Sequence, residues 1–218
     1  MPHQLSGLAP RIIYDIGANN GDDVPYYLQK ADLVVAVEAN PILAKGIEER
    51  FRNAISNGRL IVENCVLVAS PEAQVVDFYI HKTRHILSQF PRPSDGEIGQ
   101  FDRVSLPGKD VVSLIRAIGE PYYIKIDIEN YDHIVLETLF SNNIRPPFIS
   151  AESHSIEVFA LLVSAGRYGA FNLVDGETVP TKYCNHSIRT TSGTATFSFP
   201  PHASGPFGED INHMKPQK

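Results

Sequence analysis

The chain of 218 residues has little positive charge and few cysteines. Its 19 Lys and Arg residues are outnumbered by 25 Asp and Glu residues, which gives a net charge of −6 at pH 7. It therefore lacks the basic surface that nucleic-acid-binding proteins use, and we do not expect a nucleic-acid partner. The two cysteines, Cys65 and Cys184, are too few for a disulfide framework or a zinc site.

Long apolar runs are also missing. No segment approaches the roughly 20 residues that a membrane-spanning helix needs, and the N-terminal sequence MPHQLSGLAPR has no apolar core of signal-peptide length. We therefore expect a cytoplasmic protein without a membrane partner. The length and a hydrophobic fraction of 43% fit a single α/β domain. The sequence leaves the oligomeric state open, a homodimer being one alternative.

A strand followed by a glycine-containing turn opens the domain. The segment YDIGANNGD, residues 14–22, continues an apolar run that reaches Asp15 and then breaks at Gly17 and Gly21. This pattern predicts a strand, a tight turn and a helix start, the arrangement at which open parallel sheets bind ligands. We expect the two glycines to let a ligand approach the backbone. Asn19 stands where a dinucleotide-binding GxGxxG motif has its second glycine, which weakens that interpretation.

A second buried strand ends in an acid. Residues 33–37, LVVAV, form the continuous apolar run of a strand covered on both faces, and Glu38 follows directly. In nucleotide-binding α/β units an acid at this position accepts hydrogen bonds from both hydroxyls of a ribose. The alternative is that Glu38 only caps the helix that begins at Pro41. We expect a ligand with an adenosine-like sugar.

These segments, together with YYIKIDIENYD at residues 122–132, resemble the FkbM family of S-adenosylmethionine-dependent methyltransferases. The third segment is similar to the family's Lys-x-Asp-x-Glu-Gly pattern, with Asn130 in place of the glycine. Asparagine tolerates a left-handed backbone, so the turn is expected to survive. The resemblance covers roughly residues 11–175.

The resemblance implies a Rossmann-like α/β fold, with seven mostly parallel strands in the order 3-2-1-4-5-7-6 and helices on both faces. Residues 169–174 and 195–199 are expected to form its C-terminal antiparallel hairpin, with a turn at Asp175-Gly176. The expected organisation is an arm at residues 1–10, a methyltransferase domain at 11–199 and an irregular tail at 200–218.

Hydrophobic periodicity predicts the remaining elements. Helices are expected at residues 22–30, 41–57, 110–119, 131–143 and about 155–165, and strands at 60–68, 74–80, 122–128 and 148–151. The last helix should bury Ile156, Phe159, Ala160 and Val163. Residues 81–108 are rich in proline, glycine and polar residues, which predicts a long irregular loop of the kind that covers sites.

The resemblance also indicates which residues bind S-adenosylmethionine. They are Asp15, Gly17, Asn19 and Gly21 of the first turn, Glu38, Asn64 and Cys65 of the third strand, Ser88, and Asp127. Asn64 and Cys65 lie where such enzymes contact the adenine, although both could equally be ordinary strand residues.

Methyl transfer to an alcohol requires an aligned acceptor and a way to remove its proton, through a base or a metal ion. Two predicted strand ends provide suitable groups: Asp127 with Glu129, and Glu152 with His154. His154 is the first choice for the base because its ordinary pKa is near neutral, and Asp127 and Glu152 complete the expected catalytic set. Alternatively, Asp127, Glu129 and Glu152 could hold a magnesium ion. The sequence does not decide between them.

The expected function is O-methylation of a hydroxyl on a small molecule, a natural product or a sugar. Two other classes stay open. One is a methyltransferase-like module that does not catalyse, which the replacement of glycine by Asn130 favours slightly. The other is a nicotinamide-dependent oxidoreductase.

Overall fold

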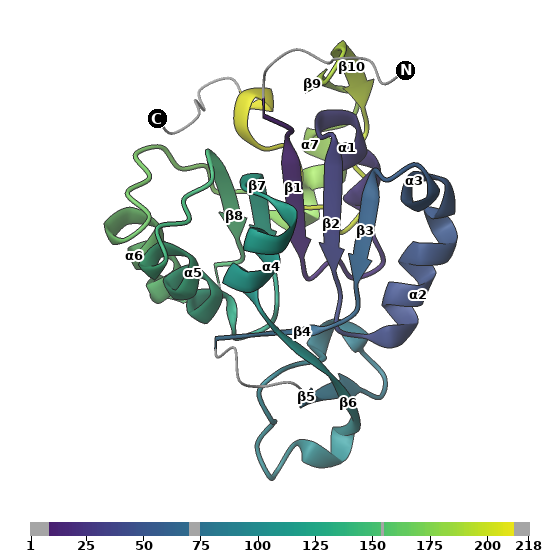
Figure 1. Ribbon diagram of the computed structural model, residues 1–218, viewed down its shortest axis with the longest axis vertical. Helices are drawn as coiled ribbons and strands as arrows, with labels where there is room; N and C mark the ends of the chain where they lie inside the picture. Colours follow the sequence, from purple (N-terminus) through teal and green to yellow (C-terminus); the bar gives the residue numbers. More distant parts are fainter. Residues whose placement is uncertain (1–8, 70–74, 154, 212–218) are drawn as a thin grey trace.

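The computed structural model describes residues 9–69, 75–153 and 155–211, and at its centre is a five-stranded sheet in which all neighbouring strands are parallel (Figure 1). The strand order is β3-β2-β1-β7-β8. The bounds are β1 Ile12–Ile16, β2 Leu33–Val37, β3 Leu60–Glu63, β7 Pro121–Ile126 and β8 Phe148–Ala151. The α/β class and the mostly parallel sheet are thus confirmed, and these five strands follow the predicted order.

The prediction of seven strands in this sheet is wrong. Residues 169–174 form no strand, and directly after them Asp175 starts a short 3-10 helix, Gly176–Thr178, by accepting a hydrogen bond from the Glu177 backbone N–H at 3.1 Å. The antiparallel hairpin lies elsewhere: β9, His186–Thr190, pairs with β10, Gly193–Phe197, as a separate two-stranded sheet. Figure 1 places this hairpin beyond the amino ends of the central strands.

Helices cover both faces of the central sheet (Figure 1). Their bounds are α1 Val24–Lys30, α2 Pro41–Arg50, α3 Arg52–Ser56, α4 Val111–Ile118, α5 Asp132–Ser141, α6 Ile156–Ser164 and α7 Val179–Lys182. The single helix predicted over residues 41–57 is interrupted at Phe51. The predicted cap of α4 is confirmed, because the Asp110 carboxylate accepts a hydrogen bond from the Ser113 N–H at 2.8 Å.

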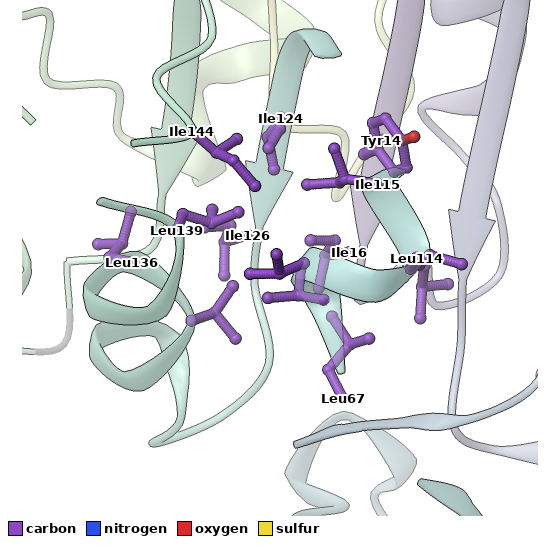
Figure 2. Packing of buried hydrophobic residues seen from close by; sticks show 14 of the residues in the cluster. Tyr14, Ile16, Leu67, Leu114, Ile115, Ile124, Ile126, Leu136, Leu139 and Ile144 are labelled. Carbon is purple, nitrogen blue, oxygen red and sulfur yellow. The ribbon is translucent and has the colours of Figure 1, made fainter. Parts of the chain in front are cut away.

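Two apolar cores result, one on each face of the sheet. Figure 2 shows the first, in which Ile16, Ile124 and Ile126 of the strands meet residues of α4 and α5. On the other face, α1, α7 and the C-terminal segment pack over the strands. There the ring of Phe207 stacks on Tyr123 with 3.6 Å between centroids. Residues 200–211 are therefore packed into the second core, although they form only one short 3-10 helix, Gly208–Asp210.

A buried ion pair fixes the end of this segment. The Lys30 ammonium lies 2.7 Å from the Asp210 carboxylate, and both side chains are almost completely buried. The Tyr26 hydroxyl donates a second hydrogen bond to the same carboxylate at 2.6 Å. These contacts join the C-terminal segment to helix α1.

A second, three-stranded sheet lies beyond the carboxyl ends of the central strands (Figure 1). It consists of β4 Val66–Val68, β6 Phe101–Asp110 and β5 Val75–His81, in that order. The predicted strand at 60–68 is split because the Asn64 side chain bonds to the end of β2 and directs the chain away from the central sheet. Only part of the predicted loop at 81–108 is irregular. Strand β6 was missed because its sequence, FDRVSLPGKD, lacks regular alternation, and only Leu106 in it is buried.

The side of helix α6 that packs against the core was predicted wrongly. Ile156, Phe159 and Val163 are 77%, 46% and 44% exposed, whereas Val158 is buried. The buried side was not recognised because nearly every residue of IEVFALLVS is apolar, so the sequence shows no preferred face. Within the described parts of the chain, no helix has the length and apolar character needed to cross a membrane.

Candidate functional site

A cavity of about 620 Å³ lies at the carboxyl ends of β1, β2 and β7. Six of the predicted cofactor-binding residues line it: Gly17, Asn19, Glu38, Cys65, Ser88 and Asp127. Strands β4 and β5 of the three-stranded sheet close it on one side through Val66, Leu67 and Phe78. The structure therefore brings together residues that are more than 100 positions apart. Asp15, Gly21 and Asn64 stand outside the cavity wall.

The two glycines of the first turn are needed for packing. Both have a φ of +78°, in the left-handed region. A Cβ on Gly17 would lie 1.8 Å from the carbonyl oxygen of Asp127, and a Cβ on Gly21 would lie 3.1 Å from Ile47 and Phe51. The turn is thus pressed against the end of β7 and against the helices that follow β2. Gly17 also lines the cavity, so the prediction that a ligand approaches its backbone closely stays a prediction.

Glu38 is buried in the cavity wall at the end of β2. Its carboxylate oxygens accept one hydrogen bond each, from the backbone N–H groups of Asn19 and Asn40, both at 2.7 Å. Burial raises the pKa of Glu38 to about 7, although these two N–H groups act in the opposite direction. The cap of helix α2 is Asn40, whose side chain accepts from the Ile42 N–H. Glu38 instead connects the first turn to the end of β2.

Below the turn, Asp15 and Lys125 form a buried ion pair. The Lys125 ammonium lies 3.4 Å from Asp15 Oδ1 and 3.3 Å from Asp127 Oδ2, and it donates a hydrogen bond to the Gly17 carbonyl oxygen at 2.8 Å. Neither oxygen of Asp15 has a hydrogen-bond partner among the described residues. Burial raises the pKa of Asp15. Burial alone would lower the pKa of Lys125, but the carboxylates of Asp15 and Asp127 raise it.

Lys125 belongs to this site but was not among the predicted site residues. The alternation of charged and apolar residues in Tyr122–Ile128 was the signal for it, because a central strand has no room for unpaired charges. Lys125 links the first turn to the end of β7 through Gly17 and Asp127. Asp15 does not line the cavity, but it pairs with Lys125 and so helps to hold this link in place.

The residues after the third strand have different roles. Asn64 donates hydrogen bonds to the carbonyl oxygens of Glu38 and Ala39, at 2.8 and 3.0 Å, and so supports the wall from behind. Cys65 is buried in the wall, and burial raises the pKa of its thiol to about 12, so it contributes as an apolar side chain. Ser88 accepts a hydrogen bond from the His81 backbone N–H at 3.1 Å.

The expected catalytic end of the cavity is acidic. Asp127, Glu129 and Glu152 all line it. Asn130 has a φ of +62°, which confirms that asparagine maintains the left-handed turn. No three Asp, Glu, His or Cys side chains in the described ranges form a group that could hold a metal ion, so the magnesium site predicted from the three acids is not supported. His154, the predicted base, lies outside the described residues.

The C-terminal segment also reaches the cavity. Pro201, His202 and Ala203 line the wall. The segment is held there by Asp23, whose carboxylate accepts hydrogen bonds from the backbone N–H of Ser204 at 3.0 Å and from its hydroxyl at 2.8 Å. Burial raises the pKa of Asp23, although these bonds oppose the increase. The sequence PPHASG has no pattern that would predict this position.

Comparison with known proteins shows a family match and a structural similarity. Residues 15–162 match the family model described as the methyltransferase FkbM domain. The chain is also similar to the crystal structure of methyltransferase FkbM from Methylobacillus flagellatus KT at 2.20 Å resolution, with 15% sequence identity and a TM-score of 0.43. That alignment covers 71% of this chain and 37% of the other, so this chain spans little more than a third of its length. No curated protein matches the sequence.

Proposed function

Because the chain belongs to the FkbM methyltransferase family, we propose that it transfers the methyl group of S-adenosylmethionine to a hydroxyl on a small molecule. Methyl transfer is supported by the family membership. That the donor is S-adenosylmethionine and that the acceptor atom is an oxygen are our proposals. The observation that carries it is the position of Glu38, an acid in the wall of a cavity at the end of the second strand.

Glu38 is suited to bind a ribose. A carboxylate offers about four acceptor positions, and two of them receive the N–H groups of Asn19 and Asn40. These bonds fix the orientation of the carboxylate and leave acceptor capacity for the two hydroxyls of the sugar. Apolar side chains on the same side of the cavity, among them Leu43, Val66 and Phe78, would surround the adenine.

The acidic end of the cavity suits the other half of the donor. A sulfonium and an α-amino group are both positively charged, and Asp127, Glu129 and Glu152 line that end. A cavity of about 620 Å³ is in the range typical of small-molecule sites. The size of the cavity and its acidic residues therefore suit S-adenosylmethionine and its two positive groups, and the donor supplies the activated methyl group when it is bound.

The acceptor must lose a proton as its oxygen is methylated. Asp127 and Glu152 stand at the ends of β7 and β8, where the acceptor hydroxyl would meet the methyl group. We propose His154, which follows Glu152 closely in the chain, as the general base. Positioning by the cavity contributes the rest of the catalysis.

Calorimetric titration with S-adenosylhomocysteine between pH 6 and 8.5 tests the ribose contact. The hydroxyls donate to the ionised carboxylate, so affinity for the parent should rise with pH, by at most about tenfold per unit, and level off above the Glu38 pKa of about 7. Glu38→Gln should weaken binding by about 1.5 to 3 kcal/mol and remove this pH dependence.

Glu63→Gln is the matched control, because Glu63 ends the adjacent strand β3 but stands outside the cavity wall. It should bind like the parent. A folded Glu38→Gln variant that binds S-adenosylhomocysteine as tightly as the parent would show that Glu38 does not hold the ribose. A parent that binds NAD but not S-adenosylhomocysteine would overturn the proposed function.

A further inference from the structure

A second cavity, of about 560 Å³, adjoins the first. Five residues belong to the walls of both: Asp127, Glu152, Gly176, His202 and Ala203. Two of these, Asp127 and Glu152, are the acids at the ends of β7 and β8. The second cavity therefore meets the first at the place where the proposed methyl transfer occurs.

The second cavity lies along the edge of the central sheet. Strand β8 is the last strand in the order, and all four of its residues line the cavity. The opposite walls come from residues 167–174 and from the C-terminal segment. Because residues 169–174 form no strand here, the edge of β8 remains beside the cavity.

Many of the other residues that line the second cavity are apolar. They include Phe148, Ile149, Leu162, Tyr168, Phe171 and Phe207. Leu173 and Phe171 also line the cavity, yet they are 86% and 40% exposed, which places them at its mouth. The Phe171 ring lies 5.1 Å from that of Phe159, itself 46% exposed on α6. Exposed apolar side chains grouped in this way usually mark a binding site.

We propose that the second cavity holds the methyl acceptor, and that the acceptor is an alcohol whose hydroxyl is carried on an apolar body. This inference rests on the proposed methyl transfer. The hydroxyl lies against the shared wall at Asp127 and Glu152, and the apolar body extends past Phe148 and Phe207 towards Leu173.

A sugar fits this arrangement poorly. Its hydroxyls point in all directions, and those that faced Phe148, Phe171 and Phe207 would lose water without gaining a hydrogen bond. The polar side chains of the same loop, Arg167 and Asn172, can meet a single carbonyl or ether oxygen on the acceptor. Three other polar side chains of this wall are already engaged: Ser150 accepts a hydrogen bond from Tyr123, Ser204 donates one to Asp23, and Lys125 pairs with Asp15 and Asp127. The wall therefore offers few groups to a ring of hydroxyls.

The test compares two probes of similar size, decahydro-2-naphthol and methyl β-D-glucopyranoside, by saturation-transfer NMR in the presence of excess S-adenosylhomocysteine. The parent should bind the naphthol derivative more tightly. Leu173→Asp should weaken its binding by about tenfold or more, because a charge at the mouth opposes entry of an apolar body. The control is Ile42→Asp, which changes an equally exposed apolar residue outside both cavities and should bind like the parent.

Affinity for S-adenosylhomocysteine, measured on the same samples, separates two kinds of failure. If the parent does not bind S-adenosylhomocysteine, the proposed function fails. If it binds S-adenosylhomocysteine but prefers the glucopyranoside, or if Leu173→Asp leaves binding of the naphthol derivative unchanged, the apolar acceptor is refuted. Self-association that Leu173→Asp abolishes, without binding of either probe, would assign the surface to a second copy of the chain and also overturn the proposal.

Discussion

Replacing Lys125 by methionine should destabilise the fold strongly, because it leaves the carboxylate of Asp15 buried without its counter-charge. The side chains of Asp15 and Lys125 are 1% and 8% exposed, so water cannot solvate the remaining charge. The same change removes the hydrogen bond to the Gly17 carbonyl oxygen, which holds the first turn against β7. Methionine has a similar length, so the loss is electrostatic more than steric.

The expected loss is about 3 to 5 kcal/mol in the free energy of unfolding, the usual effect of removing one partner of a buried pair. The variant can limit this loss by protonating Asp15, whose pKa burial already raises. A carboxyl group with a raised pKa in the folded state favours folding below its unfolded pKa, and this contribution is lost as the pH rises towards the folded pKa. The variant should therefore lose stability from about pH 4 upwards, by at most about 1.4 kcal/mol per unit.

Urea denaturation followed by circular dichroism, at pH 5 and pH 8, measures both effects. Asp15→Asn combined with Lys125→Met should be more stable at pH 8 than Lys125→Met alone, because the double variant has no buried charge at either position. The control is Lys45→Met, which breaks an exposed pair with Glu49 and should cost less than about 1 kcal/mol. Equal losses at pH 5 and pH 8, with no rescue by Asp15→Asn, would refute the reasoning.

Two further predictions concern the first turn and the C-terminal segment. Gly17→Ala should cost about 2 to 4 kcal/mol in thermal or urea unfolding, because its Cβ would collide with the Asp127 carbonyl oxygen, whereas Gly46→Ala, with open space around it, should be neutral or stabilising. The parent should lose stability relative to Asp23→Asn as the pH rises from 5 to 8, because burial raises the pKa of Asp23; parallel pH profiles for the two proteins would contradict this.

The elements that the sequence predicted well are those with local signals. Strands β1 and β2 are continuous apolar runs, and helix α4 has an acid at its N-cap and Gly119 at its end, so each could be located from a few neighbouring residues. The cavity wall at Gly17, Glu38 and Asp127 follows from them, because the carboxyl ends of parallel strands meet at one edge of the sheet.

The errors have one physical origin. In helix α6 and in residues 169–174 the side that faces the core is decided by distant segments, and the local sequence is apolar on several sides. Strand β6 depends on pairing with β5, which supplies the hydrogen bonds that its own polar sequence does not suggest. The alternation of charges indicated that Lys125 needs a partner but not which one, because Asp15 is 110 positions away in the chain.

The two cavities differ in the same way, in how far local sequence signals determine their walls. The first contains, at Gly17, Glu38 and Asp127, residues of motifs whose spacing is fixed by the strand and helix alternation. The second is bounded by residues 167–174 and by the C-terminal segment, which is held by Asp23 and by the Lys30 and Asp210 pair. The contact with Asp23 also holds Pro201, His202 and Ala203 in the wall of the first cavity, whereas residues 167–174 line the second cavity alone. Under the proposal that the second cavity holds the acceptor, we expect the choice of acceptor to depend on residues 167–174 and not on the three motifs.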